Sequence, residues 1–202
     1  MRLIDLPDPP LDDGVVSLRA FDEDDASSVG SACQDPEIPR WTIVPSPYTE
    51  RDAIAWIESH DLLRITGTAV PLAVVDSATR VLAGSIGIHD IDWRSQKGEI
   101  GYWVVRELRG LGVATRALRL LSRWGLGDLG LARLELLADV RNEASQRVAL
   151  NAGYVREGVL RSARVMKDER RDMVLFSLVT ADLPFTDEEL AMRGRSNRVE
   201  DE

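Results

Sequence analysis

The chain has 202 residues, 44% of them hydrophobic and 29% charged, which suits one domain with a well-buried core. Its net charge of −9 argues against a general nucleic-acid-binding role, because such proteins normally present a basic surface. A single cysteine and two histidines exclude an internal disulfide and a zinc site of the histidine–cysteine type, so no metal is expected.

The N-terminal sequence lacks the apolar segment of a secretory signal, and no stretch of about 18 apolar residues occurs. We therefore expect neither export nor a membrane partner. The lone thiol of Cys33 fits a reducing compartment, so the expected location is cytoplasmic.

The first half of the chain predicts an arm, two helices and four strands. Residues 1–13 are rich in proline and aspartate and form the arm. We expect a strand over 14–21, a helix with an acidic first turn over 22–35, a proline-broken loop over 36–48, and a second helix that begins at the capping-box sequence of residues 49–52. Strands over 69–76, 81–92 and 98–105 follow, and their short links make them antiparallel neighbours.

The second half predicts helices that alternate with strands, and then a hairpin. After a glycine-containing turn, apolar residues repeat at helical spacing, at Ala114, Ala117, Leu118, Leu121 and Trp124. We expect a strand over 132–140, a helix from its N-cap Asn142 to Gly153, and hairpin strands over 154–165 and 171–179. The order predicts one mixed α+β domain over 1–183, followed by a charged tail over 184–202 with a short helix and then disorder.

The turn RGLGVAT, residues 109–115, stands between a strand and a helix. The N–H groups at a helix N-terminus lack intrahelical partners, and glycine lets a ligand approach the backbone, so the turn predicts an anion site, most often for phosphate. A Walker loop needs a lysine that is absent here. A dinucleotide loop ends in glycine or alanine where this chain has Thr115, and it usually follows the first strand of a parallel unit, so this alternative is disfavoured although Glu135 suits it.

The third pattern in this turn is R-x-x-G-x-A, at Arg109, Gly112 and Ala114. It resembles the acyl-CoA pyrophosphate loop of the GNAT superfamily of N-acetyltransferases. EIGYW at 99–103 lies upstream of it, and N-x-x-S followed by A-G-Y-x-x-E-G lies downstream within 142–158. These spacings resemble the ribosomal-protein N-acetyltransferase branch, the RimJ/RimL-like enzymes.

The resemblance covers residues 14–180 and implies the GNAT fold. That fold is a mostly antiparallel, twisted sheet of about seven strands with about four flanking helices. Its sheet is splayed open between its fourth and fifth strands, which are 98–105 and 132–140 here. The backbone of the turn is then expected to bind the pyrophosphate of acetyl-CoA, and the exposed edge of strand 98–105 its pantetheine arm.

The same resemblance assigns candidate cofactor-binding residues. Asn142 is expected to bond the pantetheine arm, and Ser145 to lie near the sulfur as an acid toward the departing thiolate. Helix capping is an alternative explanation for both residues. The complete expected set is Val104, Val105, Arg109, Gly110, Leu111, Gly112, Val113, Ala114, Thr115, Asn142 and Ser145.

The acceptor amine must be neutral to attack the thioester. Deprotonating a lysine at pH 7 costs roughly 4–5 kcal/mol, whereas an N-terminal α-amine costs only about 1–1.5 kcal/mol and needs a modest base or a water relay. Glu99 is the candidate base, and with Ser145 it completes the expected catalytic pair. Candidate acceptor-binding residues are Trp41, Tyr48, His89 and Trp103.

The expected function is therefore acetyl transfer from acetyl-CoA to a primary amine, in a complex that holds both substrates. The expected amine is a protein N-terminus or a small molecule. The expected oligomeric state is a monomer or a homodimer. The alternative is a non-catalytic acyl-CoA-binding or partner-binding module on the same fold.

Overall fold

An eight-stranded sheet forms the centre of the protein in a computed structural model, which describes residues 2–183. The strand order is β1-β2-β3-β4-β5-β6-β8-β7. The strands are β1 (Leu11–Asp12), β2 (Val16–Arg19), β3 (Val70–Asp76), β4 (Leu82–Asp92), β5 (Lys97–Val104), β6 (Arg133–Asp139), β7 (Val155–Met166) and β8 (Glu169–Val179). The helices are α1 (Asp25–Ala32), α2 (Glu37–Trp41), α3 (Glu50–Thr66), α4 (Val113–Leu126) and α5 (Glu143–Asn151).

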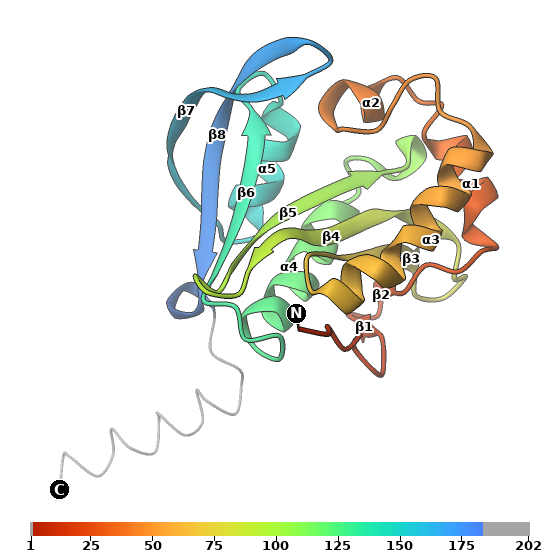
Figure 1. The fold of residues 1–202 in the computed structure, drawn as a ribbon, viewed down its shortest axis with the longest axis horizontal. Coiled ribbons are helices and arrows are strands. Elements are labelled where there is room, and N and C mark those ends of the chain that lie inside the picture. The colour runs from red at the N-terminus through yellow and green to blue at the C-terminus, as the bar shows by residue number, and fades with distance from the viewer. Residues whose placement is uncertain (1, 184–202) are drawn as a thin grey trace, which may run out of the picture.

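Helices cover both faces of this sheet (Figure 1). The larger core lies under α4 and α5 and includes Leu118 and Leu121 of α4, both fully buried. A smaller core lies under α1 and α3, around Ala53 and Ile57. Strand β5 contributes to both cores because successive side chains of a strand point to opposite faces: Ile100 packs in the larger core and Trp103 in the smaller one.

The sheet opens between β5 and β6, as expected for the GNAT fold. These two strands are the one parallel pair among the described strands, and they pair only where Lys97–Glu99 meets Arg133–Glu135. Beyond these three residue pairs, β5 continues to Val104 beside β4 while β6 continues to Asp139 beside β8. The two strands therefore diverge, and an edge of β5 is left unpaired inside the sheet.

Within residues 2–183, the structure has one strand and one α-helix more than expected. The N-terminal arm is part of the folded domain. Its residues Leu11–Asp12 form strand β1, which pairs with β2, and the side chain of Ile4 is buried. The segment expected to be a proline-broken loop contains α2. Its prolines do not prevent a helix, because Pro36 stands at the N-cap and Pro39 within the first turn, where backbone N–H groups have no helical partner. The expected tail, 184–202, lies outside the described residues.

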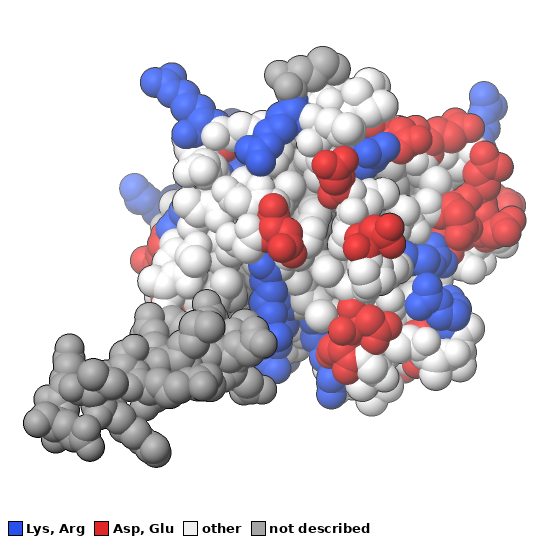
Figure 2. All heavy atoms as spheres, turned by 90° about the horizontal axis from the view of Figure 1, so that it is seen from below, with Lys and Arg blue, Asp and Glu red and all other residues white. Residues whose placement is uncertain are grey.

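Acidic and basic side chains are interspersed with uncharged ones on the face shown in Figure 2. Charges of both signs therefore lie close together on this face (Figure 2). Among residues 2–183, no helix combines the length and apolarity needed to cross a bilayer.

The predicted capping box at the start of α3 is confirmed. The Thr49 hydroxyl accepts from the Asp52 N–H (3.3 Å), and the Asp52 carboxylate accepts from the Thr49 N–H (2.7 Å). Helix α3 ends at Gly67 in the left-handed conformation (φ +75°), which suits glycine.

Thr49→Ala is expected to lower the free energy of unfolding by about 1 kcal/mol, because it removes an N-cap acceptor. Urea denaturation measures the change. Ser28→Ala, at an exposed position of α1, is the control and should change stability by less than about 0.5 kcal/mol. Equal stabilities for the two variants would show that the capping box contributes nothing.

Candidate active site

The glycine turn has the backbone geometry of an anion site. Gly110 and Gly112 adopt left-handed conformations (φ +78° and +83°), which favour glycine, and an added Cβ at either position would meet no other atom within 4 Å. Gly112 is the N-cap of α4, and it provides no side-chain cap. The N–H groups of the first turn of α4 are therefore open to a ligand, and the helix dipole favours a negative one.

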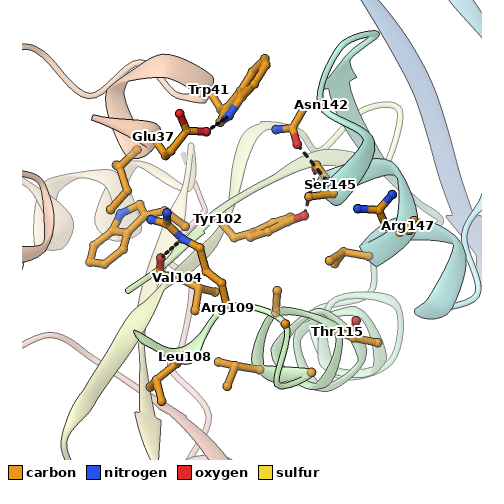
Figure 3. Close-up of a pocket in the computed structure, with 18 of the residues that line it drawn as sticks. Glu37, Trp41, Tyr102, Val104, Leu108, Arg109, Thr115, Asn142, Ser145 and Arg147 are labelled. Atoms are coloured by element: carbon orange, nitrogen blue, oxygen red, sulfur yellow. Dashed lines mark hydrogen bonds between the residues drawn. The ribbon is translucent and has the colours of Figure 1, made fainter. Parts of the chain in front are cut away.

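A cavity of about 450 Å³ begins at this turn. The turn and the start of α4 form one wall, the start of α5 forms another, and α2 lies opposite them (Figure 3). Tyr102, Trp103 and Val104 of β5 also line the cavity. Tyr102 packs against the core under α4, and Trp103 lies in the core under α1 and α3. The cavity therefore reaches from one face of the sheet to the other through the opening beside β5.

The start of α5 brings two expected residues into the cavity. Asn142 caps the helix as predicted, with its side-chain oxygen accepting from the Ser145 N–H (3.1 Å). The Ser145 hydroxyl accepts from the Tyr102 hydroxyl (2.9 Å), as Figure 3 shows. Burial raises the pKa of Tyr102 to about 12, so its hydroxyl stays protonated at neutral pH. Tyr102 was not among the residues predicted from the sequence. Strand alternation could have placed it on the α4 face, but not beside Ser145.

The Arg109 side chain points into the protein rather than along the turn (Figure 3). Its Nε donates to the Val104 carbonyl (3.0 Å), and its guanidinium pairs with Asp35 (2.7 Å) just before α2. The other Asp35 oxygen accepts from the Glu37 N–H (3.1 Å). Arg109 therefore connects the glycine turn to the start of the helix on the opposite wall.

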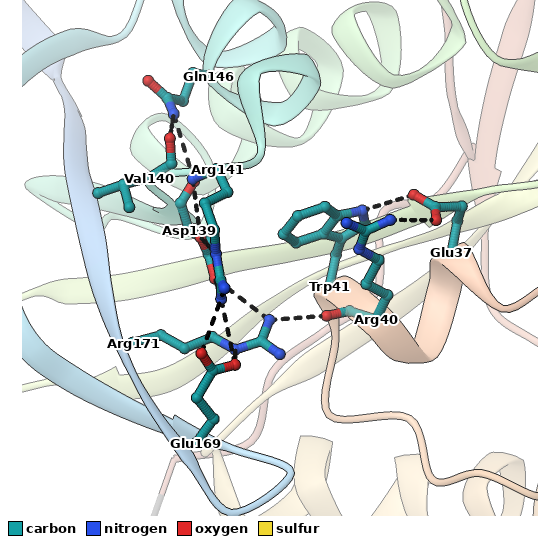
Figure 4. A network of polar contacts seen from close by, with 9 residues as sticks. All are labelled: Glu37, Arg40, Trp41, Asp139, Val140, Arg141, Gln146, Glu169 and Arg171. Atoms are coloured by element: carbon teal, nitrogen blue, oxygen red, sulfur yellow. Dashed lines mark hydrogen bonds and ion pairs between the residues drawn. The ribbon is translucent and has the colours of Figure 1, made fainter.

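A second arginine connects the other end of α2 to the β7–β8 hairpin (Figure 4). Arg171 donates to the Arg40 carbonyl (3.0 Å) and pairs with the buried carboxylate of Asp139 (3.3 Å). Within α2, the Trp41 indole N–H donates to Glu37 (2.9 Å), which fixes the ring at the cavity wall. Helix α2 is thus held at both ends by polar contacts, and the contact at its C-terminal end crosses the opening between β5 and β6.

Most expected cofactor-binding residues meet at this cavity. Those that line it are Val104, Arg109, Gly110, Gly112, Val113, Ala114, Thr115, Asn142 and Ser145. Leu111 lies within the turn but its side chain is exposed, and Val105 is turned away because its N–H donates to the Ala83 carbonyl of β4 (2.9 Å). By the alternation of an antiparallel pair, the backbone N–H groups of Tyr102 and Val104 face the opening instead.

The expected acceptor residues divide between the cavity and its surroundings. Trp41 and Trp103 line the cavity. Tyr48 is buried in the core under α1 and α3, where burial raises its pKa to about 12, and it is not part of the wall. His89 lies opposite Glu99 in the β4–β5 register, and burial lowers its pKa.

Glu99 lies where β5 and β6 separate, at the last of their three paired positions. Alternation along β5 puts it on the Trp103 face of the sheet, outside the described cavity wall. Its carboxylate forms an ion pair with Arg164 of β7. Burial raises the pKa of Glu99, and the Arg164 charge partly opposes that shift. Within residues 2–183, no three histidine, cysteine or acidic side chains gather where they could hold a metal ion.

The model of the acetyltransferase (GNAT) domain matches residues 16–155. The chain therefore belongs to the GNAT family of acetyl-CoA-dependent N-acetyltransferases, as the residue pattern indicated.

Two bacterial relatives and one solved structure refine this comparison. YdaF of Bacillus subtilis (strain 168), a candidate ribosomal N-acetyltransferase, is 36% identical over 98 residues, which are 48% of this chain and 54% of YdaF. The ribosomal-protein-serine acetyltransferase of Escherichia coli (strain K12) is 31% identical over 98 residues, 48% of this chain and 55% of that enzyme. These matches span about half of each relative. RimJ of Mycobacterium smegmatis, solved with CoA-disulfide, shares the fold with a TM-score of 0.79, 21% identity and 90% coverage of both chains.

Arg109→Ala is expected to lower the free energy of unfolding by about 1–3 kcal/mol without any ligand, because it leaves the largely buried Asp35 carboxylate without its cation. Arg116→Ala is the control; it breaks a more exposed pair with Asp13 and should cost less than about 1 kcal/mol. Urea denaturation compares the two. Equal costs would mean that Arg109 does not hold α2 in place.

Proposed function

We propose that this chain transfers an acetyl group from acetyl-CoA to the α-amine of a protein N-terminus. The observation that supports this most is the cavity that joins the glycine turn on one face of the sheet to Trp41 and Trp103 on the other. Donor and acceptor can then meet within the sheet, as direct attack requires. The names of YdaF and the E. coli relative favour a ribosomal protein as acceptor. An α-amine is also the cheaper amine to deprotonate.

The donor side follows from the turn and the open edge of β5. The backbone N–H groups of 110–115 hold the pyrophosphate, and the two left-handed glycines leave the space it needs. The Arg109 N–H is not among them, because it donates to the Arg106 carbonyl (3.3 Å). The Val104 N–H and the Asn142 side chain bind the amides of the pantetheine arm, which adds to β5 as a strand would. The Arg109 side chain does not contact the phosphates in this scheme; it supports the turn from within.

On the acceptor side, Trp41 and Trp103 contact the substrate, and Glu99 removes the ammonium proton through a bridging water. The raised pKa of Glu99 makes this carboxylate a better base than an exposed one. The half-buried His89, whose pKa is lowered by burial, and the buried Tyr48, whose pKa is raised by burial to about 12, support this wall. Ser145 faces the leaving sulfur.

Acetyl-CoA at about 100 times its Kd should raise the stability of the protein by about 2.7 kcal/mol, seen as a higher Tm. Gly112→Glu should abolish this shift, because its carboxylate repels the pyrophosphate and its side chain fills the approach. NAD and ATP serve as ligand controls.

Gly130→Glu is a matched control for this variant. Gly130 has the same left-handed conformation (φ +77°) and the same open surroundings as Gly112, but it does not line the cavity. The Gly130 variant should therefore share any loss of stability and keep the acetyl-CoA shift. If both variants respond alike, or if the natural protein shows no shift, the turn does not hold acetyl-CoA.

Arg164→Met should move the acid limb of kcat/KM to higher pH. Without the neighbouring positive charge the pKa of Glu99 rises further, so the carboxylate is protonated, and lost as a base, at a higher pH. The pH profile of acetyl transfer to a short peptide with a free N-terminal serine measures this limb.

Glu99→Gln is the reference variant in this experiment. It should lower kcat by about 100-fold or more and remove the limb that Arg164→Met displaces. An unchanged acid limb in Arg164→Met would exclude Glu99 as the base. Acetyl-CoA binding without any transfer to a panel of amines would favour the non-catalytic alternative.

A further inference from the structure

We propose that Tyr102 is a positioning residue that directs the Ser145 hydroxyl proton toward the sulfur of CoA. This inference rests on the proposed function, since it concerns how the same cavity stabilises the departing thiolate. Both side chains line the cavity, Tyr102 from β5 and Ser145 from the first turn of α5 (Figure 3).

The hydrogen bonds around Ser145 determine where its proton points. A serine hydroxyl has one proton to donate and can accept through its oxygen. The Ser145 oxygen already accepts from the Tyr102 hydroxyl (2.9 Å), and the Ser145 backbone N–H donates to Asn142 (3.1 Å). The Ser145 proton is therefore not used toward Tyr102, and it is free to be donated into the cavity.

Tyr102 is suited to keep this polarity fixed. Its ring is packed against the core under α4, and its hydroxyl remains a protonated donor over the working pH range. Without the Tyr102 hydroxyl, Ser145 could turn its own proton to other acceptors in the wall. The hydrogen bond from Tyr102 thus favours the one orientation of the Ser145 hydroxyl in which its proton points into the cavity.

The chemistry needs a hydrogen bond at this place rather than a full proton transfer. Glu99 first takes the ammonium proton through water and releases it to solvent. The neutral amine nitrogen then bonds to the thioester carbon, the C–S bond breaks with its electron pair going to sulfur, and the second nitrogen proton leaves to Glu99 through the same water. A thiol has a pKa of about 8.5 and is a much stronger acid than a serine hydroxyl, so the sulfur departs as a thiolate. Ser145 stabilises this thiolate by donating to it, and the proton stays on the serine oxygen.

The chain contains a matched pair of residues outside the cavity. Tyr154 and Ser122 also form a buried hydroxyl–hydroxyl hydrogen bond (2.8 Å), between the start of β7 and helix α4. Neither residue lines the cavity. Tyr154→Phe therefore removes a comparable hydrogen bond with no connection to the sulfur, and it controls for a purely structural effect of Tyr102→Phe.

The test measures the pKa of the thiol of CoA itself while it is bound, so it does not depend on the identity of the acceptor. Thiolate ultraviolet absorbance is followed against pH for the natural protein and for Tyr102→Phe, Ser145→Ala, Tyr154→Phe and the Tyr102→Phe/Ser145→Ala double variant. In the natural protein and in Tyr154→Phe, the bound thiol should have its pKa lowered by about one unit. This lowering should be lost in Tyr102→Phe and Ser145→Ala, and no further change should occur in the double variant.

The outcomes separate the two proposals. Failure of the natural protein to bind CoA would overturn the proposed function. If CoA binds and Tyr102→Phe keeps the thiol pKa of the natural protein, the role of Tyr102 is wrong while CoA binding stands. An equal change in Tyr154→Phe, or additive changes in the double variant, would likewise overturn it. A kcat about tenfold lower for Tyr102→Phe, with an unchanged KM for acetyl-CoA, is the expected kinetic counterpart.

Discussion

The short parallel pairing between β5 and β6 is the constraint on which the site depends. Only three residue pairs join these strands before they diverge. If more residues of β5 and β6 were paired, the free backbone N–H and C=O groups of β5 would be hydrogen-bonded and the sheet would be closed. The cavity could then not reach both faces. Because the strands separate, Tyr102 on β5 can meet Ser145 on α5, and the two cores remain connected by a passage instead of being divided by a continuous sheet.

Arginine side chains hold the chain in place around this opening, and one of them, Arg171 of β8, reaches across it to α2. Arg109 and Arg171 each combine a carboxylate partner with a backbone carbonyl acceptor, so each fixes the chain path as well as a charge. Arginine suits this task because its planar fork of donors can serve two acceptors at once. Glu99 and Arg164 form a third pair near the divergence, where burial and charge oppose each other in setting the carboxyl pKa.

Local patterns predicted much of the fold and the position of the glycine turn between β5 and α4. The alternating strands, the capping box at Thr49, the cap at Asn142 and the glycine turn are encoded within a few residues, so the sequence was sufficient to find them. The contacts of Tyr102 with Ser145 and of Arg109 with Asp35 join segments far apart in the chain, and no local signal predicts them. Helix α2 was missed because proline usually breaks helices, although the first turn tolerates it.

The two contacts that hold α2 also shape how the enzyme can evolve. At its C-terminal end the contact is made by the Arg40 carbonyl, a backbone atom that every residue type provides, and at its N-terminal end by Asp35, which precedes the helix. The Trp41 side chain at the cavity wall is not part of these contacts, whereas Ile38 is buried in the core under α1 and α3. Trp41 can therefore be exchanged without releasing the helix, so under the proposed function selection can alter acceptor preference while the glycine turn stays intact.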